Sequence, residues 1–176
     1  YYVANRLLPT VPYWISVTAF DFGSPSSGLP SLETNVTQNT ANAYPQETYA
    51  AVDSLDLKVV VYPNPYRIDA AYRARGFEGV DENGHRTTQA ERPDDRVRQI
   101  HFANVPAQCI ISIFSIDGDL VRQILHYANP TDPNASHETW DMITRNTQAV
   151  VSGLYYWTVE NSITHEVQMG KLVVIM

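Results

Sequence analysis

The sequence predicts an all-β protein folded as an antiparallel β-sandwich. Apolar residues at helical spacing are nearly absent from its 176 residues. Short runs of alternating apolar and polar residues recur instead, and Pro, Gly, Asn and Asp separate them, which is typical of strands joined by turns. A hydrophobic fraction of 44% is sufficient for a packed core.

The first part of the chain, residues 1–37, is expected to contribute the last strands of a β-domain whose earlier strands are missing. The stretch "LLPTVPYWISVTAFDFGSP" places a Leu-Pro turn ahead of Tyr13, and residues 14–20 then alternate as a strand. This arrangement resembles the tyrosine corner and penultimate strand of a fibronectin type III domain, with "GLPSLETNVT" as the last strand. Two strands cannot bury a core alone, so we expect them to pack on the next domain or on another polypeptide. Residues 38–56 are polar and lack a period, and they are predicted to form a linker with a helical turn near residues 49–52.

Residues 57–176 are expected to form a complete sandwich of about seven strands. In the second strand, Ile100 and Phe102 are predicted to point inward, and Gln99 and His101 outward. The third, "CIISIFSI", is apolar on nearly both faces, as a central strand should be. The expected strands cover residues 57–62, 97–104, 109–116, Leu120–Tyr127, a short segment around Thr139 and Trp140, Gly153–Asn161 and Val167–Ile175.

The first of these strands runs into Pro63-Asn64-Pro65. Proline has no amide hydrogen to donate to a ladder, so the strand must end there. The segment 66–96 is then predicted to be an insertion, longer than the usual connection. Its arginines and acids are balanced in number. An exposed network of ion pairs would have this composition, and so would a docking surface.

Bulk properties exclude several classes of protein. The formal net charge of −7 argues against binding to nucleic acid or to anionic membrane surfaces. No apolar run is long enough to span a bilayer. The single cysteine, Cys109, excludes an internal disulfide, a four-cysteine metal site and a CxxCH haem attachment. The opening residues lack the pattern of a signal peptide, so we expect the chain to be part of a longer precursor.

Residues that could carry chemistry are few. Cys109 with a histidine could act as nucleophile and base, but it lies in the most apolar predicted strand, where a thiol is ordinarily a small core hydrophobe. The histidines show no helical pair and no cysteine partners at zinc spacing, although His101 and His126 could face each other across the sheet. We therefore predict no catalytic, cofactor-binding or metal-binding residues. The five histidines are His85, His101, His126, His137 and His165.

Three acidic segments contain the oxygen ligands that calcium prefers: "DGD" at 117–119, "DENG" at 81–84 and "RPDDR" at 92–96. None fits a full calcium loop, and Asp117-Gly118 is a hairpin turn pair. A structural calcium ion remains an open alternative, and the insertion at 66–96 is where we would expect it to bind.

Two surface features also have plain explanations. Tyr155, Tyr156 and Trp157 could form an aromatic surface on which a sugar stacks. Neighbouring residues of a strand point to opposite faces, however, so the side chains on at least one face belong to the core. Two stretches match the N-glycosylation pattern, and we take both as chance. They are Asn35-Val36-Thr37 and Asn134-Ala135-Ser136.

Four motifs occur in order: "VVYPNPYR", "IHFANVPAQCIISIFSIDGDLVRQILH", "WDMITRNTQAVVSGLYYWTVEN" and "GKLVVIM". Together they resemble the C-terminal Ig-like modules of large exported bacterial proteins, which are related to the Ig-like domain of the flagellar hook-capping protein. They also resemble the C-terminal sorting domains of type IX secretion cargo. The resemblance covers residues 57–176 and implies an Ig-like sandwich, export, attachment or assembly, and no catalysis. Fibronectin type III units often precede such modules, in agreement with residues 1–37.

The leading hypothesis is a non-enzymatic structural or assembly module at the C-terminus of a secreted or cell-surface bacterial protein. A protein partner, or the remainder of the same precursor, would complete the N-terminal β-domain. The long insertion at 66–96 favours a retained module over a sorting signal that is removed. The alternative is an accessory or carbohydrate-binding C-terminal domain of a secreted enzyme whose catalytic part lies upstream.

Overall fold

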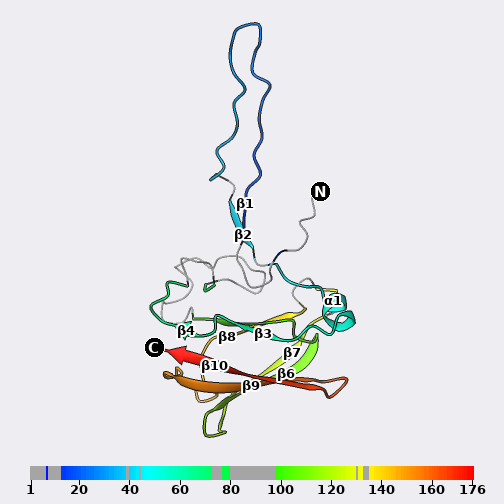
Figure 1. Cartoon of the computed structure of the whole chain (residues 1–176), viewed down its shortest axis with the longest axis vertical. Coiled ribbons are helices and arrows are strands. Elements are labelled where there is room, and N and C mark those ends of the chain that lie inside the picture. The colour runs from blue at the N-terminus through cyan, green and yellow to red at the C-terminus, as the bar shows by residue number, and fades with distance from the viewer. Residues whose placement is uncertain are drawn as a thin grey trace.

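The computed structural model describes residues 7, 13–38, 40–43, 45–72, 77–79, 98–129, 131–132 and 135–176. These residues form two packed β-sheets, one short helix and a projecting hairpin (Figure 1). The predicted all-β sandwich is thereby confirmed. Within the described ranges no helix is long and apolar enough to cross a membrane.

The larger sheet has five strands in the order β4-β10-β9-β6-β7. Neighbours pair antiparallel, except that β4 lies parallel to the end of β10. Strand β6 lies inside the sheet, between β9 and β7, in agreement with its apolar character on both faces. The strands are β4 (Tyr66–Arg67), β6 (Gln108–Ser115), β7 (Leu120–Tyr127), β9 (Gly153–Asn161) and β10 (Val167–Ile175).

The smaller sheet has three antiparallel strands in the order β3-β5-β8. They are β3 (Val60–Tyr62), β5 (Ile100–Ala103) and β8 (His137–Trp140). His101, which was predicted to point outward, is buried all the same, as are all four residues of β5. Phe77, from the segment that follows β4, approaches the ring of Tyr62 edge-on, and Tyr62 stacks on His101. The outer face of this sheet is therefore covered around His101, by Tyr62 of β3 and by Phe77.

The inner faces of the two sheets share one apolar core. Trp140 of β8 is fully buried and meets Tyr155 of β9 at a ring-centroid distance of 6.3 Å. Phe102 of β5 meets Trp157 of β9 edge-on at 6.1 Å. These aromatic contacts join the sheets, and such pairs add about 0.5–1.5 kcal/mol each to the stabilisation from buried area.

Asn64 explains how the chain passes between the sheets after β3. Its side-chain Nδ2 donates to the Lys171 carbonyl at 2.9 Å, and its Oδ1 accepts from the Val173 amide at 3.2 Å. One side chain thus substitutes for a ladder partner on the edge of β10. The insertion predicted at 66–96 does not leave the sandwich at its start, because Tyr66 and Arg67 form β4 and Tyr66 is buried. Most of its later residues lie outside the described part of the chain.

The N-terminal residues form a hairpin. Strand β1 (Tyr13–Ile15) pairs antiparallel with β2 (Ala41–Ala43), and the chain between them extends away from the sandwich (Figure 1). We call residues 13–38 and 40–43 the arm. The predicted linker, 38–56, contains β2 and the helix α1 (Tyr49–Ser54), so part of it is regular structure. The boundaries placed between domains stay predictions.

Candidate functional site

Among the described residues, exposed large apolar side chains are concentrated on the arm. Their exposed fractions run from 51% at Ile15 to 89% at Phe22. Phe20 and Phe22 touch each other edge-to-face at 6.1 Å but neither is buried. The exposed set is Trp14, Ile15, Val17, Phe20, Phe22, Leu29, Leu32 and Val36. Exposed apolar surface of this extent is typical of interaction sites.

Hydrogen bonds, not a core, hold the arm together. Beyond the β1–β2 ladder, isolated bridges join Phe20 to Glu33 and Ser24 to Leu29. Asp21 fixes the outer part, since its Oδ1 accepts from the amides of Leu32 at 3.0 Å and Gly23 at 2.8 Å. These two bonds, Leu32 first, lower the pKa of Asp21. The arm thus has a defined hairpin path while its apolar side chains stay largely exposed.

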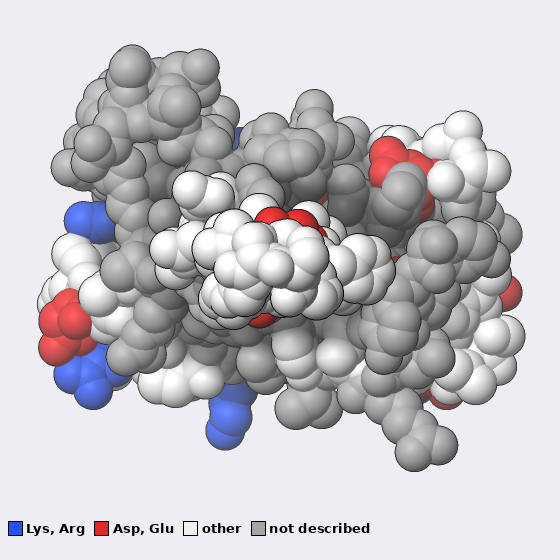
Figure 2. All heavy atoms as spheres, turned by 90° about the horizontal axis from the view of Figure 1, so that it is seen from above, with Lys and Arg blue, Asp and Glu red and all other residues white. Residues whose placement is uncertain are grey.

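The arm is almost uncharged. Its sequence contains no Lys or Arg, and its acids are Asp21 and Glu33. In the view down the arm, its surface is largely that of uncharged residues (Figure 2). Burial of this element would therefore require little desolvation of charge.

Cys109 does come together with a histidine and a carboxylate. It lies directly opposite His126 in the β6–β7 ladder, and His126 Nδ1 is 2.8 Å from Glu138 Oε2. His126 Nε2 lies 2.9 Å from the Ala135 carbonyl. Because both nitrogens face acceptors, both must donate, and this favours the protonated ring.

The resulting protonation states suit packing and not nucleophilic catalysis. Burial lowers the pKa of His126, but the bonds to Glu138 and Ala135 outweigh it and the net pKa is raised. Burial, with a smaller effect of Glu138, raises the pKa of the fully buried Cys109 thiol to about 12. A protonated ring cannot accept a proton from a protonated thiol. The pair instead links the edge strands β7 and β8 of the two sheets.

His101 does not face His126, as the sequence suggested, because the two lie in different sheets. Its partner is His137, with 3.1 Å between His101 Nδ1 and His137 Nε2. His101 Nε2 lies 2.5 Å from the Phe77 carbonyl, which can only accept, so this nitrogen carries the proton. Nδ1 of a neutral His101 then accepts from His137. Burial lowers the pKa of both rings, that of His137 to about 3.

The remaining sequence candidates are scattered. Gly118 has φ +90° in the predicted turn at 117–119, an exposed loop. Asn35 accepts from the Thr37 amide at 2.9 Å in a turn of the arm. His165 is exposed near Glu160. Among the described residues no three His, Cys, Asp or Glu side chains are placed to hold a metal ion. His85, the segments 81–84 and 92–96, and Asn134 lie outside the described residues.

The aromatic run on β9 does not form a platform. Tyr155 and Trp157 are buried in the core, and Tyr156 alone points outward with 45% of its surface exposed. The alternation expected for a strand is therefore observed. The three rings do not share one exposed surface on which a carbohydrate could stack.

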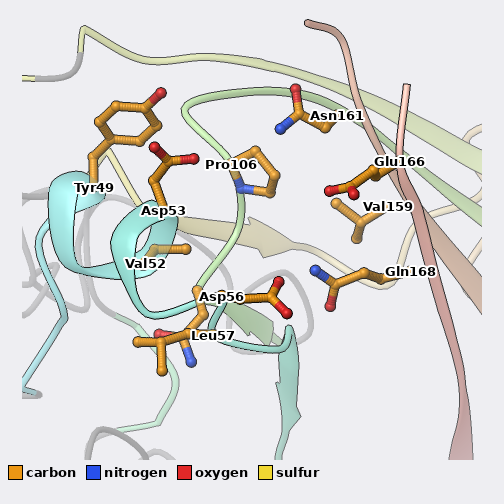
Figure 3. Close-up of a pocket in the computed structure, with 11 residues that line it drawn as sticks. Tyr49, Val52, Asp53, Asp56, Leu57, Pro106, Val159, Asn161, Glu166 and Gln168 are labelled. Carbon is orange, nitrogen blue, oxygen red and sulfur yellow. The ribbon is translucent and has the colours of Figure 1, made fainter. Parts of the chain in front are cut away.

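A cavity that the sequence did not indicate lies where α1, the segment after β5 and the β9–β10 hairpin meet (Figure 3). Its volume is about 100 Å³. Asp53 of α1 and Asp56, just after it, face Glu166 and Gln168 of the hairpin. The walls come from residues more than one hundred positions apart, so no local motif marks them.

Comparisons with known proteins give partial structural similarity and nothing by sequence. No protein-family model matches the chain, and no curated protein matches it significantly. It is similar to PorZ, an essential bacterial surface component of the type-IX secretion system of human oral-microbiomic Porphyromonas gingivalis, at 17% identity and a TM-score of 0.45, over 80% of this chain and 14% of that one. It is also similar to dimeric latent PorU from Porphyromonas gingivalis, at 13% identity and a TM-score of 0.37, over 96% of this chain and 12% of that one. This chain thus spans a small part of both proteins.

Proposed function

We propose that the chain is a non-enzymatic attachment and assembly module of a secreted or cell-surface bacterial protein. Its arm would dock by completing a β-domain with another polypeptide or with the remainder of its own precursor. The observation that carries this proposal is the set of eight exposed apolar side chains on the arm. The motif resemblance described above supports the secreted or surface setting.

The arm has the two features that binding by strand addition requires, which are an extended backbone edge and exposed apolar side chains. Its backbone is extended and cross-linked by few ladder bonds, so its edges can accept a further strand. Its apolar side chains would gain about 1.5–3 kcal/mol each on full burial, before the cost of association is subtracted. The sandwich provides the rigid base from which the arm projects (Figure 1).

The experiment is hydrogen exchange of the arm amides, measured in the 176-residue chain alone and in the complete gene product purified from the cells that produce it. We expect exchange across residues 16–36 to be about 100-fold slower in the complete product, because docking removes local opening. The double variant Phe20→Ser and Phe22→Ser should abolish this protection. Leu125→Ser, which changes a residue of similar exposure on β7, serves as the control. Equal exchange in the two samples would overturn the proposal.

A further inference from the structure

Strand β7 lies at the edge of the larger sheet, so only one of its sides faces β6. The Ala128 amide, just after the strand, donates to the Ala107 carbonyl at 2.8 Å. In an antiparallel ladder every second residue directs both its amide and its carbonyl to the same neighbour, so Arg122, Ile124 and His126 also direct theirs toward β6. The alternate residues direct theirs away from the sheet, and they are Gln123, Leu125 and Tyr127. We call these three residues the open edge.

The open edge has a defined limit at each end. On one side of it, the Val121 carbonyl accepts from the Arg145 amide at 2.7 Å. On the other side the chain turns at Asn129, whose carbonyl accepts from the Asp132 amide at 2.8 Å. Between these positions, the outward amides and carbonyls of the open edge form no hydrogen bond with any described residue. All three residues of the open edge are exposed.

The side chains of β7 do not protect this edge against pairing. Lysine or proline on an exposed edge discourages the addition of another strand, and Leu120–Tyr127 contains neither. The side chains of the open edge lie on the outer face of the larger sheet, because the alternate residue His126 is buried on the inner one. Leu125 is 59% exposed and Tyr127 is 63% exposed. Apolar surface therefore accompanies the unpaired backbone groups.

We infer that the open edge pairs antiparallel with the open edge of a second copy of this chain, about a two-fold axis at Leu125. Leu125 then lies opposite Leu125 of the second copy, and Gln123 lies opposite Tyr127. Each outward amide and carbonyl of the open edge gains a backbone partner, and the two larger sheets continue as one.

The limits of the open edge favour a second copy over an unrelated strand. With Leu125 on the axis, the outward bonds of the ladder use the open edge and no other residue. Any other antiparallel register that keeps all three residues paired brings in Val121 or Asn129, whose carbonyls are already occupied. Because the limits are the same in both copies, the two edges also match in length.

The charges of β7 permit this pairing. Arg122 would lie opposite Ala128 of the second copy, so it does not meet a like charge. His126 would lie opposite Ile124, and it is already paired with Glu138 within its own copy. The arm takes no part, since the larger sheet lies on the side of the sandwich away from it (Figure 1).

The first test is sedimentation velocity of the 176-residue chain, together with hydrogen exchange of the β7 amides. So short a ladder makes a small interface, and we expect a weak dimer that forms between about 10 µM and 1 mM. The amides of the open edge should exchange about fivefold more slowly when the total concentration is about ten times Kd. The amides of Arg122, Ile124 and His126 should not respond, because they are bonded to β6 in the monomer as well.

A charge exchange at the axis tests the register. Leu125→Lys and Leu125→Glu each place two like charges opposite one another and should weaken self-association about tenfold. An equimolar mixture of these two variants should restore it, because opposite charges then meet. Met169→Lys is the matched control: Met169 is an exposed apolar residue on the outer face of the same sheet, and that variant should associate as the unaltered chain does.

A backbone variant tests the ladder itself. Gln123→Pro removes one outward amide and leaves the bonds to β6 in place, so it should also weaken self-association. If that variant does not fold, the exchange of charge at Leu125 still decides the question. The double variant Phe20→Ser and Phe22→Ser should associate normally, since it alters only the arm.

Four outcomes would overturn the inference. They are a chain that stays monomeric at about 1 mM, an equal response of the outward and inward β7 amides, a mixture of the Leu125 variants that does not associate, and loss of association in the arm variant. The last result would show that the copies meet through the arm. Docking of the arm is measured at residues 16–36, so this inference and the proposed function can fail separately.

Discussion

Replacement of Gly170 by alanine should destabilise the sandwich, although alanine for glycine in a strand usually does the opposite. Gly170 lies opposite Trp157 in the β9–β10 ladder, and the indole covers the glycine. A Cβ at this position would lie 2.4 Å from Trp157 Cζ2 and 2.6 Å from Cε2. Carbon atoms prefer about 3.5–4.0 Å, so the ring or the strand must move by about 1 Å.

The indole has little room to move, since Trp157 is 7% exposed and its ring contacts Phe102. Overpacking of this kind costs about 1–3 kcal/mol, and the reduced freedom of the unfolded chain returns about 0.4–1 kcal/mol. We expect a net loss of about 1–2 kcal/mol in the free energy of unfolding. For a chain of this size, that is a fall of about 2–8 °C in Tm.

Urea denaturation followed by tryptophan fluorescence measures the effect. Gly153→Ala is the matched control, because its Cβ would meet only Tyr155 Cε2 at 3.7 Å, an ordinary contact. That variant should be unchanged or more stable. In a Trp157→Phe background, Gly170→Ala should cost less, since the smaller ring frees the space. Equal or greater stability of Gly170→Ala in the original chain would refute the argument.

Three further outcomes are expected. The folded-state pKa of His137 is depressed to about 3, so the unfolded chain takes up a proton first as the pH falls below about 6.5 and stability is lost on the acid side. His137→Gln should therefore reduce the loss in urea midpoint between pH 7.5 and pH 5, and an unchanged pH dependence would contradict the assignment. Asn64→Ala removes both bonds to the edge of β10 and should cost about 1 kcal/mol in urea denaturation, whereas no loss would show that water replaces them. Cys109 should resist alkylation at pH 8 in the folded chain and react after unfolding, because its thiol is buried and protonated; rapid reaction of the folded chain would disprove this.

The sandwich could be predicted because its longer strands are specified locally. Gly153–Asn161 and Val167–Ile175 are rich in β-branched, aromatic and other apolar residues, and both are observed with the expected bounds. Gly118 indicates the β6–β7 turn, because this position has a positive φ that glycine adopts readily. Such signals lie within a few neighbouring residues, which a sequence displays directly.

Features that depend on distant parts of the chain could not be predicted. The local pattern places His101 on the outer face, and its burial there depends on contacts with Tyr62, His137 and Phe77, which are distant in the sequence. Residues 41–43 were predicted to lie in a polar linker, and their pairing with β1 depends on residues that are distant in the sequence. The cavity beside α1 combines Asp53 and Glu166, which lie more than one hundred positions apart, so no local pattern indicates it.

Strand β10 has consequences for how the domain bears mechanical load. Its final residues are held on one side by β9 and on the other by β4, and the Ile68 amide adds a bond to the Ile175 carbonyl at 2.9 Å. A pull on Met176 along the strand strains these bonds together, in shear, and does not peel them apart one at a time. A tether attached at this end would therefore detach at a higher force than one attached through a strand bonded on a single side.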